Sequence, residues 1–263
     1  MLETTLLDRR VKPATLTPAG QALLKKAKAI LGAVEELKQA ASSDAEPEGV
    51  LRIGVAHALA EPTLAGSLTH LGASFPRISL HLVSGWTADL LAQLDRGELD
   101  AALVFGAGEA ARLPHLPGKL LASEALVMLA SRHLPLPKRP TIADLNIFGW
   151  VLTPDGMCGS RSALRQAVEK AGAEFRIAAE VHDVGLQASL VERGLGIGLM
   201  PKRRAQQMRR PSLRTLVLPG LDLGMAVSLA RGPYPGRLGK ALDSLERDLC
   251  SVFRGEKRLA SGK

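Results

Sequence analysis

Apolar residues recur with a heptad spacing near the start of the chain. Between residues 17 and 41 they are separated alternately by four and three positions, which is the repeat of helices that pack side by side. The seam consists of Leu23, Ala27, Ile30, Val34, Leu37 and Ala41. Thr17 is a favourable N-cap, and Pro18 suits the first helical position because its missing N–H needs no partner there. The pattern predicts a helix over residues 17–41, about 36 Å long, that dimerises through this seam.

The charged residues of this helix are sorted by sign along its length. Lysines occupy positions 25, 26 and 28, and glutamates occupy positions 35 and 36. A parallel partner would place like charges together, whereas an antiparallel copy centred near Ile30 and Leu31 would place lysines opposite glutamates. Lys38 departs from this sorting. An amphipathic helix that packs on its own domain is the alternative that this segment leaves open.

After residue 41 the helical repeat gives way to alternating strands and helices. Residues 42–49 are polar, with Pro47 and Gly49, and are predicted to form a hinge. The predicted strands behind it are 50–56, 78–85, 98–106, 125–131, 149–152, 176–181, 196–200 and 225–232, and the predicted helices are 63–75, 87–96, 161–171, 184–193 and 236–253. Such alternation is typical of an α/β fold with a parallel sheet and right-handed crossovers.

A stretch with several prolines, residues 113–140, separates two modules of similar size. The sequence therefore predicts two α/β lobes with a cleft between them. The first lobe is expected to comprise about 50–123 and 223–253, the second about 124–222, and residues 254–263 to form a flexible tail. Residues 1–16 are interpreted as the end of one helix followed by a basic turn. In that turn Arg9, Arg10 and Lys12 could contact a phosphate backbone, although three basic residues are more often a solvated turn.

Composition limits the classes of protein that need to be considered. None of the apolar runs among the 263 residues approaches the roughly 18 residues that a membrane span needs, and no charged-then-apolar leader opens the chain. The two cysteines, Cys158 and Cys250, form no disulfide framework, so we expect a cytoplasmic protein that is not bound to a membrane. The net charge of +8 is compatible with a polyanionic partner. The aromatic content of 3% argues against RNA or single-strand binding by base stacking.

Motifs for catalysis or metal binding are missing from the sequence. It contains no GxSxG, no HExxH and no phosphate loop, and its six histidines form no i, i+4 pair. Residues 194–198 (GLGIG) follow a predicted helix and open a strand, the reverse of the order in a dinucleotide site. Cys158 lies near a predicted helix N-terminus, but no second cysteine is close in sequence to resolve an oxidised form. We therefore expect neither an enzyme nor a cofactor, and give little weight to redox sensing.

The loops that follow the predicted strands are the best candidates for a ligand site. In open α/β sheets ligands bind outside the carboxyl ends of the strands, where helix N-termini present their N–H groups. The candidate effector-binding residues are Ala56, His57, Ala58, Ser84, Gly85, Trp86, Thr87, Met157, Cys158, Ser160, Arg161, Val184 and Gln187. Arg161 could pair with a carboxylate or face solvent, and Trp86 could flank an apolar ligand or cover a helix start. His57 is more often a loop hydrogen-bonder than a ligand contact.

Taken together, these segments resemble a LysR-type transcriptional regulator. Residues 6–10 (LLDRR) and 16–31 (LTPAGQALLKKAKAIL) match the wing and linker-helix signature of that family, and residues 51–56, 75–85, 97–106 and 191–201 follow its effector domain in order and spacing. The resemblance implies a winged-helix DNA-binding domain, a linker helix that dimerises antiparallel, and a two-lobed effector domain of the periplasmic-binding-protein type (type 2). It also implies promoter DNA, a small-molecule effector and a homodimer or homotetramer as partners.

The chain departs from the family pattern in two places. Most of the family's helix-turn-helix is expected before residue 6. Either the start of the sequence is misplaced and the full protein binds DNA, or this chain senses and oligomerises with sequence-specific DNA binding lost or impaired. The first effector loop has Ala56 and Ala58 where relatives often place hydroxyl side chains, which disfavours a small anion held by hydroxyls. The alternative function is a freestanding solute-binding protein without a transcriptional role, which the lobes would suit and the heptad helix would not.

Overall fold

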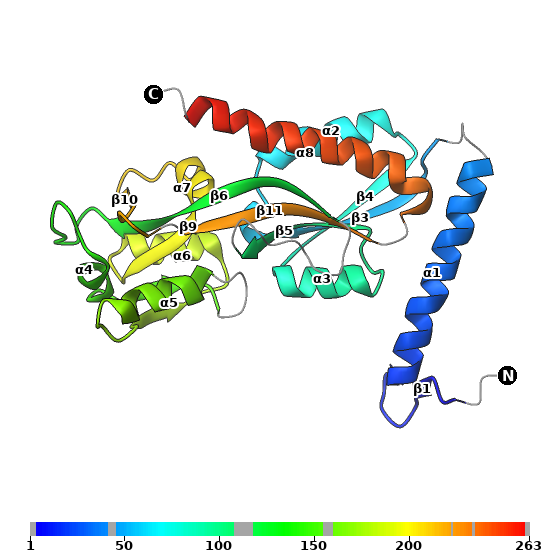
Figure 1. Ribbon diagram of the computed structural model, residues 1–263, viewed down its shortest axis with the longest axis horizontal. Helices are drawn as coiled ribbons and strands as arrows, with labels where there is room; N and C mark the ends of the chain where they lie inside the picture. Colours follow the sequence, from blue (N-terminus) through cyan, green and yellow to red (C-terminus); the bar gives the residue numbers. More distant parts are fainter. Residues whose placement is uncertain are drawn as a thin grey trace.

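A long helix stands apart from the rest of the molecule. The computed structural model describes residues 4–41, 46–107, 118–154, 160–221, 223–232 and 235–260. Helix α1 (Pro18–Ala41) approaches the main body near its C-terminal end, where it packs against the short 3-10 helix η2 (Gly236–Leu238) (Figure 1). The helix predicted from the heptad pattern is thus confirmed, and its length leaves most of its surface away from the two lobes.

The segment before α1 forms a small hairpin. Strand β1 (Leu7–Asp8) pairs antiparallel with β2 (Thr15–Leu16), so the predicted helix end is wrong for the described residues of this segment. The Thr17 hydroxyl donates to the Thr5 carbonyl oxygen at 2.7 Å and accepts from the Gly20 N–H at 3.0 Å. The Thr17 side chain therefore satisfies a backbone carbonyl group of the segment before α1 and a backbone N–H group in the first turn of the helix.

The first lobe is built on a five-stranded part of the sheet. Its strand order is β4 (Ile78–Gly85), β3 (Gly49–Ala56), β5 (Ala101–Ala107), β11 (Gly224–Arg231) and the first half of β6 (Gly118–Ser131). Strand β3 runs parallel to β4 and β5, whereas β11 runs antiparallel to β5 and β6. Helices α2 (Thr63–Ser74) and α8 (Gly239–Ala260) cover one face and α3 (Thr87–Asp95) the other (Figure 1).

The second lobe continues the same sheet beyond β6. The second half of β6 pairs antiparallel with β9 (Ile197–Pro201) and β10 (Leu213–Leu216), and β7 (Trp150–Leu152) runs parallel to β8 (Ile177–Glu180) and β9. The helices of this lobe are α4 (Ile142–Asn146), α5 (Ser160–Lys170), α6 (Val184–Glu192) and α7 (Lys202–Gln207). The chain crosses between lobes where the Leu126 N–H donates to the Leu223 carbonyl oxygen at 2.7 Å.

Two predicted elements need correction. The strand expected at 125–131 begins at Gly118, and it is antiparallel to its neighbours, so the sheet is mixed rather than parallel. Residues 118–124 of β6 are stabilised by pairing with β11. The residues around this segment in the sequence do not predict that pairing. Residues 254–260, predicted as a tail, continue α8. Glu, Lys, Arg, Leu and Ala are strong helix formers, which outweigh the single glycine in this segment.

Each lobe has its own hydrophobic core. Leu51, Leu71 and Leu90 are fully buried at the centre of the first lobe, between the sheet and its helices. Trp150 is fully buried in the second lobe, and its Nε1–H donates to the Asn146 Oδ1 at 2.8 Å, so the indole is satisfied without water. Separate cores joined by β6 and β11 are what a cleft between lobes requires, because each lobe keeps its shape when the cleft opens.

A buried polar cluster also joins the lobes. Glu61 precedes α2 in the first lobe, and its carboxylate lies 3.3 Å from Arg203 Nε and accepts from Gln207 Nε2 at 2.9 Å; both partners are on α7 of the second lobe. The Arg203 guanidinium carbon is 4.2 Å from the ring centroid of Phe253 on α8. The side chains of Glu61 and Arg203 are only 1% and 10% exposed. This cluster holds the two lobes together on the α7 side of the sheet.

Helices long and apolar enough to cross a membrane do not occur in the described part of the chain. Groups of three or more His, Cys, Asp or Glu side chains that could hold a metal ion are likewise absent from those residues.

Candidate functional site: a cleft between the lobes

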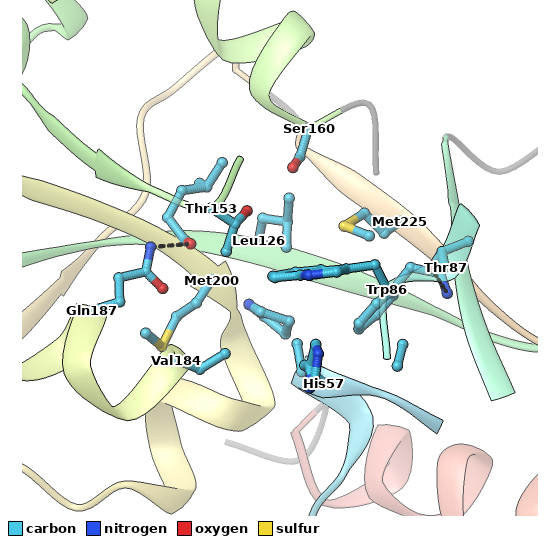
Figure 2. A pocket seen from close by; sticks show the side chains of 15 residues that line it. His57, Trp86, Thr87, Leu126, Thr153, Ser160, Val184, Gln187, Met200 and Met225 are labelled. Carbon is cyan, nitrogen blue, oxygen red and sulfur yellow. Dashed lines mark hydrogen bonds between the residues drawn. The ribbon is translucent and has the colours of Figure 1, made fainter. Parts of the chain in front are cut away.

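A cavity lies between the two lobes and takes its walls from both (Figure 2). The volume open to the centres of water-sized spheres in it is about 60 Å³. Its lining residues are Ala56, His57, Ala58, Trp86, Thr87, Phe105, Leu126, Thr153, Ser160, Val184, Gln187, Leu199, Met200, Pro201 and Met225. A space of this size, between lobes joined by crossing strands, suits a small ligand enclosed by the closed form of the protein.

The first-lobe wall is formed at the carboxyl ends of the parallel strands. Ala56 ends β3, and His57 begins the 3-10 helix η1 (His57–Leu59) that follows it. Trp86 is the N-cap residue of α3, directly after β4. Because β3 is parallel to β4, with Ala56 opposite Gly85 in the register, the residues that follow these strands lie side by side at one edge of the sheet.

The second-lobe wall is held by hydrogen bonds at the starts of two helices. Ser160 begins α5, and α6 is capped by the Asp183 carboxylate, which accepts from the Leu186 N–H at 2.6 Å. On α6 the buried Gln187 amide donates to the carbonyl oxygens of Val151 at 2.8 Å and of Leu199 at 3.3 Å. These bonds to β7 and β9 fix the Gln187 side chain where it lines the cavity.

Three ring systems bring the lobes together beside the cavity. The ring centroids of His57 and Trp86 are 4.8 Å apart and those of Trp86 and His182 are 5.6 Å apart, both edge to face. Trp86 belongs to the first lobe, whereas His182 lies between β8 and α6 in the second. Edge-to-face packing suits rings of this kind, so Trp86 contacts both lobes at once. The indole projects into the space that the lining residues enclose (Figure 2).

The structure gathers most of the candidate residues around this cavity. Those that line it are Ala56, His57, Ala58, Trp86, Thr87, Ser160, Val184 and Gln187. Ser84 and Gly85 are not among the lining residues, and Gly85 instead faces the side chain of Leu90. Met157 and Cys158 lie outside the described residues. Whether the gathered residues bind an effector stays a prediction.

Arg161 does not line the cavity. Its NH1 group donates to the Glu180 carboxylate at 2.6 Å and to the Thr153 carbonyl oxygen at 3.0 Å, and the side chain is largely buried. Glu180 is on β8, which lies beside β7. The carboxylate that pairs with Arg161 in this structure is therefore that of Glu180, and not the carboxylate of a ligand. Arg161 therefore braces the loop after β7 in this structure.

Several lining residues were not predicted from the sequence. Phe105, Leu126, Leu199 and Met225 come from within β5, β6, β9 and β11, where apolar residues indicate core rather than a site. His182, which does not line the cavity but packs edge to face against Trp86, was missed as well; its position directly before the N-cap Asp183 was the available signal. These residues reach one cavity only because β6 and β11 pass between the lobes.

The cavity is predominantly apolar and carries no fixed charge from the described residues. None of the described lining residues is an aspartate, glutamate, lysine or arginine. The hydroxyl groups come from Thr87, Thr153 and Ser160. Ala56 and Ala58 contribute only methyl groups, and the polar side chains of the lining come from both lobes.

The dimerisation and DNA-contact candidates are far from this cleft. Ile30 and Leu37 are 64% and 72% exposed, Ala27 and Val34 are exposed and Leu23 is partly so, while the Ala41 side chain lies outside what is described. Arg9, Arg10 and Lys12 are exposed between β1 and β2. The Arg10 guanidinium bonds the Asp8 carboxylate at 2.9 and 2.8 Å, which lowers the pKa of Asp8.

Two α/β lobes around a ligand-sized cleft define a small-molecule binding domain of the periplasmic-binding-protein type. The profile of the LysR substrate binding domain family matches residues 44–233, and the chain belongs to this family. The expected fold class is therefore confirmed.

The relatives of this chain are named as transcriptional regulators. It is 28% identical over 204 residues to the HTH-type transcriptional regulator GltR of Bacillus subtilis (strain 168), a match that covers 76% of this chain and 66% of GltR. It is 29% identical over 260 residues to a probable hydrogen peroxide-inducible genes activator of Streptomyces viridosporus, covering 94% of this chain and 82% of that protein. The chain thus spans just under two thirds of GltR and about four fifths of the Streptomyces protein.

Solved structures show the same fold. A full-length OxyR variant from Pseudomonas aeruginosa superposes with a TM-score of 0.76 at 21% identity, covering 96% of this chain and 83% of that one. CbnR, titled a LysR family transcriptional regulator, superposes with a TM-score of 0.57 at 22% identity, covering 93% of this chain and 85% of that one.

Proposed function

We propose that this chain is a ligand-responsive regulator of transcription that binds a small molecule between its lobes and dimerises through α1. The observation that carries the proposal is the cavity lined from both lobes, behind a helix whose apolar seam is exposed. A ligand that touches both walls stabilises the closed arrangement, and its differential affinity for closed and open forms is what a sensor transmits. Promoter DNA as the partner implies a cytoplasmic protein that acts as a switch rather than as an enzyme.

The lining supports a small effector without net charge. A carboxylate or phosphate entering this cavity would lose its hydration without finding a cation among the described lining residues, which is costly. An apolar or aromatic body against Trp86, Phe105 and Met225, with one polar edge toward Thr153 and Ser160, would be satisfied there. This class of ligand is consistent with the alanines of the first loop, which offer no hydroxyl groups.

Trp86 provides a direct measure of occupancy of the cleft. A thermal-shift screen of metabolites and of matched pairs such as benzamide and benzoate should give hits enriched in the uncharged member. A ligand at a hundred times its dissociation constant adds roughly 2.7 kcal/mol to the free energy of unfolding. Hits should also change the tryptophan fluorescence of the wild type.

The Trp86→Phe variant is the control for that experiment. The other tryptophan of the chain, Trp150, is fully buried in the second lobe and does not line the cavity. The ligand-dependent fluorescence change should therefore disappear in the variant. A change of equal size in Trp86→Phe, or hits drawn mainly from the anionic members, would contradict the proposed site.

The basic turn between β1 and β2 is proposed to contact DNA phosphates. Arg9 and Lys12 are exposed, and no described carboxylate pairs with either of them, whereas Arg10 is partly neutralised by Asp8. In gel shifts at several salt concentrations, the double variant Arg9→Gln/Lys12→Gln should flatten the dependence of log K on log[salt] by about 1.8, since each phosphate contact contributes about 0.9. The exposed Lys170→Gln should leave that slope unchanged. An unaltered slope in the double variant would exclude this turn from the DNA contact.

A freestanding solute-binding role is the alternative function. The two lobes alone would suit it, and it gives no reason for an exposed heptad seam. Cell fractionation distinguishes the two: recovery of the protein from the periplasm would favour the alternative.

A peroxide signal is a second candidate, favoured by the names of several relatives. The thiol of Cys158 would reduce hydrogen peroxide, giving a sulfenic acid and water. Mass spectrometry of protein treated with peroxide, compared with Cys158→Ser and Cys250→Ser, tests this. Oxidation that survives in Cys158→Ser would assign it to another residue and remove the candidate.

A further inference from the structure

A second cavity lies in the second lobe, outside the cleft, and three arginines line it. Its volume is about 220 Å³, larger on the same measure than that of the cleft. Arg132 follows β6, Arg214 is on β10, and Arg210 lies in the connection between α7 and β10. Leu129, Ala205, Met208, Leu213 and Thr215 complete the lining. Three arginines thus contribute to the lining of one cavity, together with apolar side chains.

Each of these arginines is held in place by a neutral group of the protein. Arg132 Nε donates to the Pro211 carbonyl oxygen at 2.9 Å, and Arg214 donates through NH2 to the Leu134 carbonyl oxygen at 2.9 Å. Arg210 donates through NH1 to the Ser189 hydroxyl at 3.0 Å. Long side chains anchored in this way lose less freedom when they bind a further group, so the site is preorganised.

The charges of this cavity are not balanced. Arg210 pairs with Glu192 at 2.8 Å, whereas no carboxylate of the described residues pairs with Arg132 or Arg214. Three guanidinium groups with one carboxylate leave an excess of two positive charges.

The backbone beside the cavity is strained. Arg209 has φ +45°, and it is the single described non-glycine residue in the left-handed region. That conformation is unfavourable for a residue with a side chain. It turns the chain directly before Arg210. Strain of this kind concentrates at ligand sites, where it fixes the direction of a functional side chain.

We propose that this cavity binds a small molecule bearing a phosphate group. The planar guanidinium fork matches phosphate oxygens in two parallel hydrogen bonds, and two uncompensated arginines match a dianion. The DNA backbone is the less suitable source of such a group. Strand β10 and helix α7 lie at the end of the molecule opposite the hairpin of β1 (Figure 1). The site is also distinct in chemistry from the cleft, whose described lining has no fixed charge.

Isothermal titration at constant ionic strength tests the proposal, with pyrophosphate and adenosine monophosphate as probes and a short DNA duplex as competitor. Saturable binding of one probe molecule per chain is expected. Arg132→Gln and Arg214→Gln should each weaken it at least about tenfold, since a charge-assisted hydrogen bond contributes about 1.5–3 kcal/mol. Arg214→Lys keeps the charge without the fork and should fall between the wild type and Arg214→Gln.

Arg139→Gln provides the matched control, because it removes the same charge from an exposed position of the same lobe that does not line the cavity. Its affinity for the probes should stay within about twofold of wild type. Equal weakening in Arg139→Gln, no saturable binding, or displacement of the probes by the duplex at stoichiometric concentration would overturn the proposal. Unchanged melting temperatures in Arg132→Gln show that lost binding is not lost folding.

Discussion

Replacing both Ile30 and Val34 with aspartate is expected to convert the protein from an oligomer into a monomer. These residues are 64% and 42% exposed in the single chain, although they occupy the apolar seam of α1. Packing them against a second copy removes apolar surface from water, which contributes about 1.5–3 kcal/mol for each fully buried side chain. Two aspartates in each helix would instead have to be desolvated without a partner, which strongly opposes association.

Sedimentation velocity measures this result. The double variant Gln21→Asp/Ala22→Asp adds the same negative charge to exposed positions of α1 outside the seam, and it should keep the wild-type sedimentation coefficient. The melting temperature of the lobes should be unchanged in both variants, because all four substituted side chains are exposed in the single chain. An oligomer that survives in Ile30→Asp/Val34→Asp would show that another surface joins the subunits.

The second large effect is expected at the buried cluster between the lobes. Glu61→Ala should lower the free energy of unfolding by about 3–5 kcal/mol, because it leaves the Arg203 guanidinium in a buried site without its carboxylate. Gln207 also loses its acceptor. Urea denaturation monitored by circular dichroism gives the size of the effect. The protein should also become easier to open at the cleft, since the cluster joins the two lobes.

An exposed ion pair is the appropriate comparison for that variant. Arg96 Nε lies 2.7 Å from the Glu98 carboxylate, and the two side chains are 55% and 49% exposed. Glu98→Ala should therefore cost no more than about 1 kcal/mol. Adding Arg203→Met to Glu61→Ala should recover part of the lost stability, since a buried charge is replaced by an apolar side chain of similar length. A Glu61→Ala variant within about 1 kcal/mol of wild type would show that the cluster contributes little.

Local pattern was a reliable guide where one element decides its own structure. The heptad seam and the Thr17 cap predicted α1, and the alternation behind residue 50 predicted the longer helices and most strands of both lobes, whereas the short helices α4 and α7 were not predicted. A helix repeats its buried face every three to four residues and a strand every two residues. Both periods can be recognised without knowing which element packs against that face. The loops after β3 and β4 and the starts of α5 and α6 were named for the same reason, because parallel strands carry their ligand sites at their carboxyl ends.

Contacts between distant segments could not be obtained in this way. Arg161 was weighed as a ligand-binding residue, but Glu180 on a neighbouring strand takes its guanidinium. The first half of β6 was missed because its stability comes from pairing with β11, about a hundred residues further along the chain. His182 reaches Trp86 only after the second lobe is placed against the first.

The order of apolar and polar residues by itself determined that this chain has a rod-like helix followed by two α/β lobes, since those periods act within a single element. Only the tertiary structure decided which side chains meet. It closed a cavity around Trp86 whose described lining has no charged side chain, and it buried Glu61 against Arg203. It also left two arginines of the second lobe without carboxylates among the described residues. The physical reason is that desolvation and ion pairing depend on what surrounds a group in space, and sequence distance does not report it.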